Sequence, residues 1–277
     1  MLPLRTSPQK AGVVMPVSVA QAGAKLPLTV VIPTLNEARQ IATALEALRW
    51  VDEVIVADGG STDLTGELAQ QHGASVIELR GQSIGAQRNA AIARARNAWV
   101  LALDADERVT DALRDELARV LLSPAHEAYR VRCENYFLGR ERKRGRWGRD
   151  WHVRLFRRDR RFSEDRVHES LEAVSDVGDL SGPIRHVPYR NLTHHLEKMV
   201  VYARWGAKEL HARGRHATAW DLLGRPAWRF VRDYFLYGSW RDGRYGLVTS
   251  LLTACAGFLK YAYLWELDQA PPASRPG

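Results

Sequence analysis

Two aspartates, Asp104 and Asp106, stand two residues apart directly after the apolar run 99–103. Such a run is typical of a buried strand, so both carboxylates are expected at the rim of a sheet, where their charge needs a partner. Mg²⁺ and Mn²⁺ prefer carboxylate oxygens and complete their coordination with water and ligand phosphates. The pair therefore indicates a divalent cation that bridges a nucleotide diphosphate. A solvated turn is the alternative for an isolated pair, so the segments before it decide.

Those segments alternate between short apolar runs and helical periodicity. Three apolar runs, at 28–32, 54–57 and 76–77, predict strands, and each is followed by a loop and a stretch of helical spacing. This order predicts an α/β fold with a mostly parallel, Rossmann-like sheet covered by helices on both faces. Ligands of such sheets bind at the carboxyl ends of the strands. Asp58, at the end of the second run, shares that edge with the aspartate pair.

The loops also carry residues that can begin the helices. Thr34 and Glu37 have the spacing of a capping box, and Asn36 is a good cap by itself. In the following loop, Ser61 or Asp63 can cap the next helix. These structural roles stay open beside any role in binding.

Four segments carry a resemblance through their order and spacing. They read VIPTLNE at 31–37, VADGGSTD at 56–63, QRN at 87–89 and LDADE at 103–107. Together they resemble the donor-binding half of family 2 glycosyltransferases, which have the GT-A fold. The chain looks most like the bacterial lipopolysaccharide core glycosyltransferases, whose second half commonly has RLFR and VHE segments, matched here at 154–157 and 167–169.

The resemblance implies a UDP-sugar donor and assigns residues to it. Asp104 and Asp106 would hold Mg²⁺ or Mn²⁺, and Arg88 would lie near the phosphates or the donor sugar. The nucleotide base and ribose would be contacted by Pro33, Leu35, Asn36, Glu37 and Asp58. The chemistry agrees, because a metal and a nearby arginine stabilise the negative charge that grows on a departing diphosphate. In the plainer interpretation Arg88 pairs with an acid and Asp58 caps a turn.

Transfer to an acceptor hydroxyl also requires a general base. Glu169 is the first candidate because it matches the VHE segment of the family, where His168 could help to set its position, and Asp165 is the second. Glu169 could instead be a surface acid paired with an arginine. A single in-line displacement assisted by this base would invert the anomeric centre.

A basic segment lies between Arg140 and Arg161, with eleven Arg or Lys and three Asp or Glu. Its surplus of +8 equals the formal net charge of the whole chain. Such a patch suits an acidic partner: nucleic acid, anionic lipid, or an acceptor with phosphates and carboxylates. Trp147 and Trp151 within it also resemble a stacking surface for single-stranded nucleic acid. The donor-site segments favour an acidic, lipid-linked saccharide acceptor, with no nucleic acid.

The last third changes character, so we predict three parts: a disordered lead at 1–26, a catalytic domain at 27–190 and a helical region at 191–277. Leu247–Leu259 is thirteen residues without charge, too short to span a bilayer unless Lys260 snorkels. Trp and Tyr beside Arg suit a helix at the membrane interface, and a buried helix is the equal alternative.

The predicted location is the cytoplasm, peripheral on the inner face of the inner membrane. Cys133 and Cys255 lack zinc or redox spacing, which favours a reducing compartment.

The function expected is a metal-dependent, inverting transfer of a hexose, with glucose favoured, from a UDP-sugar to a lipopolysaccharide inner-core or other lipid-linked acceptor. A nucleotidyltransferase would place a glycine-rich phosphate loop after the first strand, and 33–37 is not such a loop. A nucleic-acid-binding module using 140–161 is the third alternative.

Overall fold

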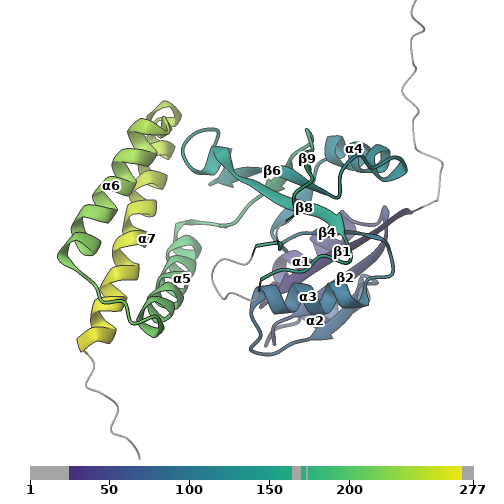
Figure 1. Cartoon of the computed structure of the whole chain (residues 1–277), viewed down its shortest axis with the longest axis horizontal. Coiled ribbons are helices and arrows are strands. Elements are labelled where there is room, and N and C mark those ends of the chain that lie inside the picture. Colours follow the sequence, from purple (N-terminus) through teal and green to yellow (C-terminus); the bar gives the residue numbers. More distant parts are fainter. Residues whose placement is uncertain (1–24, 164–169, 173, 270–277) are drawn as a thin grey trace, which may run out of the picture.

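The computed structural model describes residues 25–163, 170–172 and 174–269, and Figure 1 shows its two parts, a sheet with helices and a separate group of helices. Four parallel strands form the first half of the sheet in the order β3-β2-β1-β4. Their bounds are Leu26–Thr34 for β1, Val51–Asp58 for β2, Ser75–Glu78 for β3 and Trp99–Ala102 for β4. All four were predicted. The first 24 residues of the predicted lead lie outside the described residues, and Leu26 already belongs to β1.

Helices cover both faces of this sheet because successive strand residues point to opposite sides. In β1, Val30 and Ile32 pack with the cluster that holds Leu45 of α1 and Leu117 of α4, whereas Val31 packs with the cluster of α3 on the other side. The helices are α1 (Ala38–Glu46), α2 (Thr65–Gln71), α3 (Ile84–Arg94) and α4 (Asp111–Leu122). The arrangement confirms the predicted α/β class.

The second half of the sheet is mixed. β8 lies antiparallel between β4 and β6, and β6 continues the sheet to β10 and β5. The strands are β5 (Glu107–Val109), β6 (Ala128–Phe137), β7 (Arg140–Glu141), β8 (Trp151–Arg157), β9 (Val177–Asp179) and β10 (Ile184–His186). This half brings β8, β10 and the loop after β4 together, which sequence periodicity alone does not predict.

The helices after Asn191 form a lobe of their own, called here the helical lobe, residues 191–269. The long helix α7 (Arg244–Gln269) packs between α5 (Leu192–Ala212) and α6 (Arg225–Val231), as Figure 1 also shows. Two π-helical turns, η2 (Trp220–Gly224) and η3 (Arg232–Leu236), flank α6, and a short 3₁₀ helix, η4 (Ser239–Asp242), leads into α7.

The loop between β7 and β8, which includes the 3₁₀ helix η1 (Trp147–Arg149), joins this lobe to the sheet. Asp233 is 4% exposed and accepts hydrogen bonds from the Arg146 N–H (2.7 Å) and the hydroxyls of Ser239 and Ser250. Gly145 lies so close that a Cβ there would be 2.2 Å from the Ser239 oxygen. A buried acid thus fixes the position of this loop against the lobe.

Two expectations about local structure were wrong. The capping box does not form: no side chain of its own loop caps α1, and the Ala38 N–H donates instead to Asp63 Oδ2 of the next loop at 3.2 Å. The predicted role of Asp63 at α2 is confirmed, since Asp63 Oδ1 accepts from the Thr65 N–H at 3.1 Å. Asp63 therefore serves two helices, and the hydroxyl of Thr34 is buried without a partner.

The basic segment is not one continuous patch either. Arg142 is buried and pairs with Asp242 of the helical lobe at 2.7 Å, and Arg154 is buried under the sheet edge. Arg157 lies over the Trp99 ring, and Arg158 donates to backbone carbonyls. Much of the surplus charge therefore belongs to internal contacts, because side chains alternate between the two faces of β8.

Candidate active site

The carboxyl edge of β1 and β2 is built from two interlocked loops. Asn36 has a φ of 57°, a left-handed conformation that asparagine tolerates better than most residues. Its side-chain oxygen accepts from the Thr62 N–H at 2.8 Å, and its own N–H donates to the Ser61 hydroxyl at 2.9 Å. The Glu37 N–H donates to the Thr65 hydroxyl at 2.8 Å. These cross-loop bonds hold the backbone after β1 in one shape.

Asp58 ends β2 opposite Thr34 of β1 and organises its own turn. Its Oδ1 accepts from the N–H groups of Gly60 and Ser61, at 3.2 and 2.8 Å, and from the Ser61 hydroxyl at 2.6 Å. Gly60 has a φ of +99°, and a Cβ there would lie 2.6 Å from Arg80. The predicted turn-capping role of Asp58 is thus confirmed, and the side chain, 7% exposed, still lies at the predicted edge.

Asp104 follows β4 and is bound by two arginines from different elements. Arg88 of α3 donates to Oδ1 at 2.7 Å, and Arg154 of β8 donates to Oδ2 at 3.3 Å. Burial opposes ionisation, but the two guanidinium groups hold the pKa of Asp104 well below its usual range. Asp104 is therefore a carboxylate at all working pH values. Arg88, predicted beside the phosphates, lies next to the predicted metal ligand.

Glu107 anchors this loop from below. Its side chain is fully buried, accepts from Arg154 at 2.5 Å through Oε1, and accepts from the Asp104 N–H at 3.0 Å through Oε2. Burial raises the pKa of Glu107 against the opposing effect of Arg154. Arg154, although buried, has its pKa raised by the carboxylates of Glu107 and Asp104. The pair fixes the turn that presents Asp104.

Asp106 points toward a different set of partners. His186 of β10 lies 3.4 Å from its Oδ1, and Lys198 of α5 lies 3.6 Å from its Oδ2. The side chain is 11% exposed. Burial lowers the pKa of His186, but the contact with Asp106 and the charge of Glu107 raise it by more, so the pKa lies above its ordinary value. Since Lys198 belongs to the helical lobe, that lobe contributes directly to the site.

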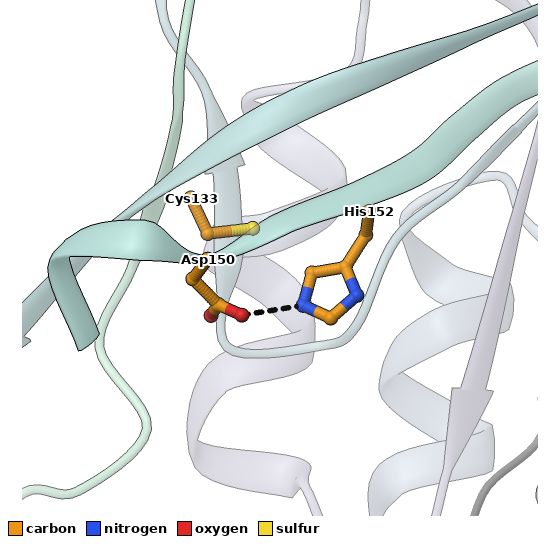
Figure 2. A group of neighbouring side chains, drawn as sticks. All are labelled: Cys133, Asp150 and His152. Atoms are coloured by element: carbon orange, nitrogen blue, oxygen red, sulfur yellow. Dashed lines mark hydrogen bonds and ion pairs between the residues drawn. The ribbon is translucent and has the colours of Figure 1, made fainter. Parts of the chain in front are cut away.

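A chain of hydrogen bonds leads from Asp106 away from the donor edge. His186 Nδ1 lies 2.7 Å from the side-chain oxygen of Asn135, whose amide donates to Asp150 at 2.9 Å. Asp150 in turn bonds His152 at 2.8 Å, as Figure 2 shows with the neighbouring Cys133. This series of contacts links Asp106, the predicted metal ligand, to Asn135 and Asp150, which lie 29 and 44 positions later in the sequence.

Cys133, Asp150 and His152 offer ligand atoms within 4.8 Å of one another and so form a second candidate metal centre (Figure 2). Burial, with Glu107 and Asp150, raises the pKa of the Cys133 thiol to about 12. A thiol must lose its proton to ligate a metal. This trio is therefore a poorer cation site than Asp104 and Asp106, whose oxygen donors suit Mg²⁺ or Mn²⁺.

The structure has two cavities in this part of the molecule. The first, about 240 Å³, is lined by residues of the interlocked loops and of the segment before α5: Asn36, Glu37, Arg39, Asp63, Arg190 and His194. The second, about 190 Å³, is lined by Asn135, Arg146, Trp147, Asp150, His186, Pro188 and Tyr189. His186 connects the second cavity with the aspartate pair, because it lines that cavity and lies 3.4 Å from Asp106. The first cavity is lined by two of the predicted nucleotide-binding residues, Asn36 and Glu37.

An aromatic stack supports the second cavity. The buried His195 of α5 lies parallel to Tyr189, with ring centroids 3.7 Å apart, and its ring centroid is 6.0 Å from that of Trp147. Burial is the larger cause and the neighbouring His194 the smaller cause that together lower the pKa of His195 to about 4. The Nδ1 of His195 has no hydrogen-bond partner. The ring is therefore neutral in the folded protein at neutral pH.

This titration predicts a pH dependence of stability. The unfolded chain protonates His195 near its ordinary pKa of about 6.5, whereas the folded chain resists until about 4. Because the unfolded state binds the proton first, this residue lowers stability as pH falls through 6.5, by roughly 2 kcal/mol between pH 7.5 and 5. His195→Phe, which keeps the stacked ring, should lose that part of the pH dependence. Urea unfolding at both pH values measures it, and parallel curves for the two proteins would contradict the assignment.

The predicted residues are distributed as follows. Asn36, Glu37 and Asp58 lie together at the edge, and Asp104 and Asp106 leave the same loop in different directions. Pro33 is half-buried in β1, and Leu35 is 52% exposed. Glu169 and Asp165 lie outside the described residues, so their roles stay predictions.

Sequence reasoning missed three kinds of residue. The first is the buried pair Glu107 and Arg154, although both lie in segments that carried the resemblance. The second is His186 with Lys198, which no local pattern distinguishes. The third is Asn135, whose two bonds join His186 to Asp150.

The two aspartates fit a divalent cation. Both are oxygen donors on one short loop, Asp104 is held ionised, and neither accepts a bond shorter than 2.7 Å from its cationic neighbours. The contacts of Asp106 with His186 and Lys198, at 3.4 and 3.6 Å, are long enough to leave its oxygens available to a cation. Asp104 would have to exchange a 2.7 Å bond from Arg88 for the metal.

Comparison with known proteins identifies the family of this chain. The model of glycosyl transferase family 2 matches residues 29–172, which include the donor-edge residues and Arg154. The lipopolysaccharide core biosynthesis glycosyltransferase LpsC of Rhizobium meliloti is 28% identical over 260 residues, covering 87% of this chain and 93% of LpsC. Among solved structures, Staphylococcus aureus TarS (1–349) in complex with UDP-GlcNAc is 15% identical, with a TM-score of 0.48, over 87% of this chain and 91% of that chain. Glucosyl-3-phosphoglycerate synthase of Mycobacterium tuberculosis, in complex with Mn²⁺ and UDP, is 26% identical, with a TM-score of 0.34, over 41% and 44%. Since the family model covers more than half of the sequence, the chain belongs to glycosyl transferase family 2, and it is a glycosyltransferase.

Proposed function

We propose that this glycosyltransferase moves a hexose, with glucose favoured, from a UDP-sugar to a lipopolysaccharide inner-core or similar lipid-linked acceptor. One observation carries the donor side: Asp58 and the Asp104/Asp106 loop follow β2 and β4, the two parallel strands on either side of β1, with Arg88 bonded to Asp104. Family membership and the similarity to LpsC along most of both chains support the acceptor class.

On the donor side, each residue has a distinct task. Asn36, Glu37 and Asp58 form the edge against which the uridine would lie, and the interlocked loops keep that edge rigid before the donor binds. Asp104 and Asp106 would hold Mg²⁺ or Mn²⁺, which neutralises charge on the departing diphosphate. Arg88, already fixed beside Asp104, adds a positive charge at the same place.

On the acceptor side, the second cavity offers an aromatic wall and polar groups. Trp147 and Tyr189 present ring surfaces on which a sugar can pack, while Asp150 and Asn135 offer hydrogen-bond partners for hydroxyls. Glu169, with Asp165 as the second candidate, would accept the proton from the attacking hydroxyl, and the single displacement would invert the anomeric centre.

We place the enzyme in the cytoplasm, peripheral on the inner face of the inner membrane. Within the described residues, α7 is the one helix long and apolar enough to cross a membrane, yet only 28% of its apolar window is buried. Its exposed apolar residues recur at helical spacing along one side: Leu247, Val248, Leu251, Phe258 and Trp265. A second series of exposed apolar residues recurs at similar spacing along η2, α6 and η3: Trp220, Leu223, Trp228, Val231 and Phe235. Exposed Trp and Phe on such helices suit the headgroup region of a bilayer.

Thermal unfolding with nucleotides tests the donor assignment. UDP is expected to raise the melting temperature in the presence of Mn²⁺, and to do so much less with EDTA, because the metal joins the diphosphate to the aspartates. CDP, GDP and ADP with Mn²⁺ serve as controls for the base. Indifference to every nucleotide would contradict the proposal. Product analysis with candidate UDP-sugars and purified lipid acceptor then identifies the sugar.

A further inference from the structure

Four cationic side chains near the junction of the helical lobe and the sheet lack an acidic partner. Arg146, Arg229, Arg232 and Lys260 have no carboxylate within 4 Å among the described residues. The Nε of Arg232 is buried and has no hydrogen-bond partner. The acids of the same lobe are engaged elsewhere, since Asp221 binds Arg215 and Arg225, and Asp268 binds two histidines.

Glycines on neighbouring helices make room for two of these cations. Arg229 of α6 lies flat against α7: its Cδ and Nη1 are 3.0 and 3.2 Å from where a Cβ of Gly257 would stand. The stem of Lys260 crosses α5 in the same way, with its Cδ 2.9 Å from the corresponding point of Gly206. Both charges are therefore held at fixed positions between helices rather than extended into solvent.

The electrostatic environment of this group is unfavourable by itself. Burial lowers the pKa of Arg229, and Arg146 and Arg232 lower it further, with Tyr261 opposing. Burial also lowers the pKa of Lys260, and Arg229, Arg225 and Arg215 add to the effect, with Asp221 opposing. Half-buried like charges without a counterion destabilise a fold, so an anion bound among them would relieve that repulsion.

The group adjoins the second cavity. Arg146 lines that cavity together with Trp147 and Tyr189, and it is near enough to Arg229 to act on its charge. The Arg146 N–H donates to Asp233 of the helical lobe at 2.7 Å, which ties this edge of the cavity to the lobe that carries the other three cations. A ligand with its sugar in the cavity would thus carry any nearby anionic substituent toward the cations.

We infer that Arg146, Arg229, Arg232 and Lys260 bind a phosphate group of the acceptor saccharide, whose sugar ring packs on Trp147 in the adjoining cavity. The inference rests on the proposed function and names the chemical class of its acceptor. Arginine suits this role because its planar donors match phosphate oxygens in pairs. In this inference, the acceptor is recognised by Arg146 and by cations of the helical lobe, rather than by the whole basic segment 140–161.

Binding without catalysis tests the inference. Micelles of deep-rough lipopolysaccharide, intact or dephosphorylated with hydrofluoric acid, are titrated into the full chain in EDTA, so that no metal recruits phosphate to the aspartates. The wild type is expected to bind the phosphorylated form at least about tenfold more tightly than the dephosphorylated form. Arg229→Gln with Lys260→Gln should remove that preference, and Arg241→Gln, which removes an exposed arginine stacked on Trp240, should keep it.

Three further outcomes discriminate between explanations. Equal affinity of the wild type for both micelles, or an unchanged preference in the double variant, would overturn the inference. Equal loss of binding to phosphatidylglycerol vesicles that carry no saccharide would assign the cations to lipid headgroups instead, which also overturns the inference.

The stabilisation by UDP and Mn²⁺ should persist in the double variant, and this separates a failure of the phosphate site from a failure of the donor assignment. A melting temperature at or above that of the wild type would show that the variant is folded.

Discussion

Replacing Asp106 by asparagine is expected to lower the rate of sugar transfer by roughly 10³-fold while leaving the chain folded. The amide keeps the volume of the side chain and its polar contacts with His186 and Lys198, but it removes one negative ligand of the proposed metal. Sugar transfer at saturating Mn²⁺ measures the loss. The Mn²⁺-dependent stabilisation by UDP should fall in parallel, which connects the lost rate to the metal.

Asp52→Asn is the matched control for this change. Asp52 lies at the start of β2, the strand end away from the site, where it accepts from the Asn97 amide at 3.1 Å and lies 3.9 Å from Arg96. The same loss of one negative charge should there leave transfer near the wild-type rate. If Asp106→Asn remained fully active, the metal assignment would be wrong.

The largest effect on stability is expected for Arg154→Met. This change leaves the carboxylate of Glu107 buried without its partner and removes one of the two arginines that bind Asp104. Loss of one member of a buried ion pair costs about 3–5 kcal/mol. Urea unfolding should therefore show a marked fall in the midpoint. Arg157→Met, three positions later on β8, removes only a cation lying over the Trp99 ring and should cost about 1 kcal/mol or less.

The double variant Arg154→Met with Glu107→Met tests the physical reason. Removing both charges leaves no uncompensated ion, so most of the lost stability should return. Activity should not return with it, because the Glu107 carboxylate also accepts from the Asp104 N–H and shapes the turn that presents Asp104. A double variant as unstable as Arg154→Met alone would show that packing, rather than charge, dominates at this position.

The sequence by itself determined the order of strands and helices in the first half of the chain and the edge at which Asp58, Asp104 and Asp106 lie. These features depend on local periodicity and on the rule that parallel strands share a carboxyl edge, so they can be read from neighbouring residues. The capping box failed for the opposite reason. Asp63, which lies in the next loop, reached the start of α1, and no pattern within 34–37 could predict that.

Only the tertiary structure decided which charges meet. Arg154 finds Glu107 across 47 positions, Lys198 of the helical lobe reaches Asp106, and Arg142 pairs with Asp242. A count of charges along 140–161 gives the surplus of positive charge but not which arginines face solvent. Strand pairing and burial turn some of these arginines inward and leave others without partners. Pairing of charges depends on distances between segments far apart in the chain, and packing, rather than local sequence, sets those distances.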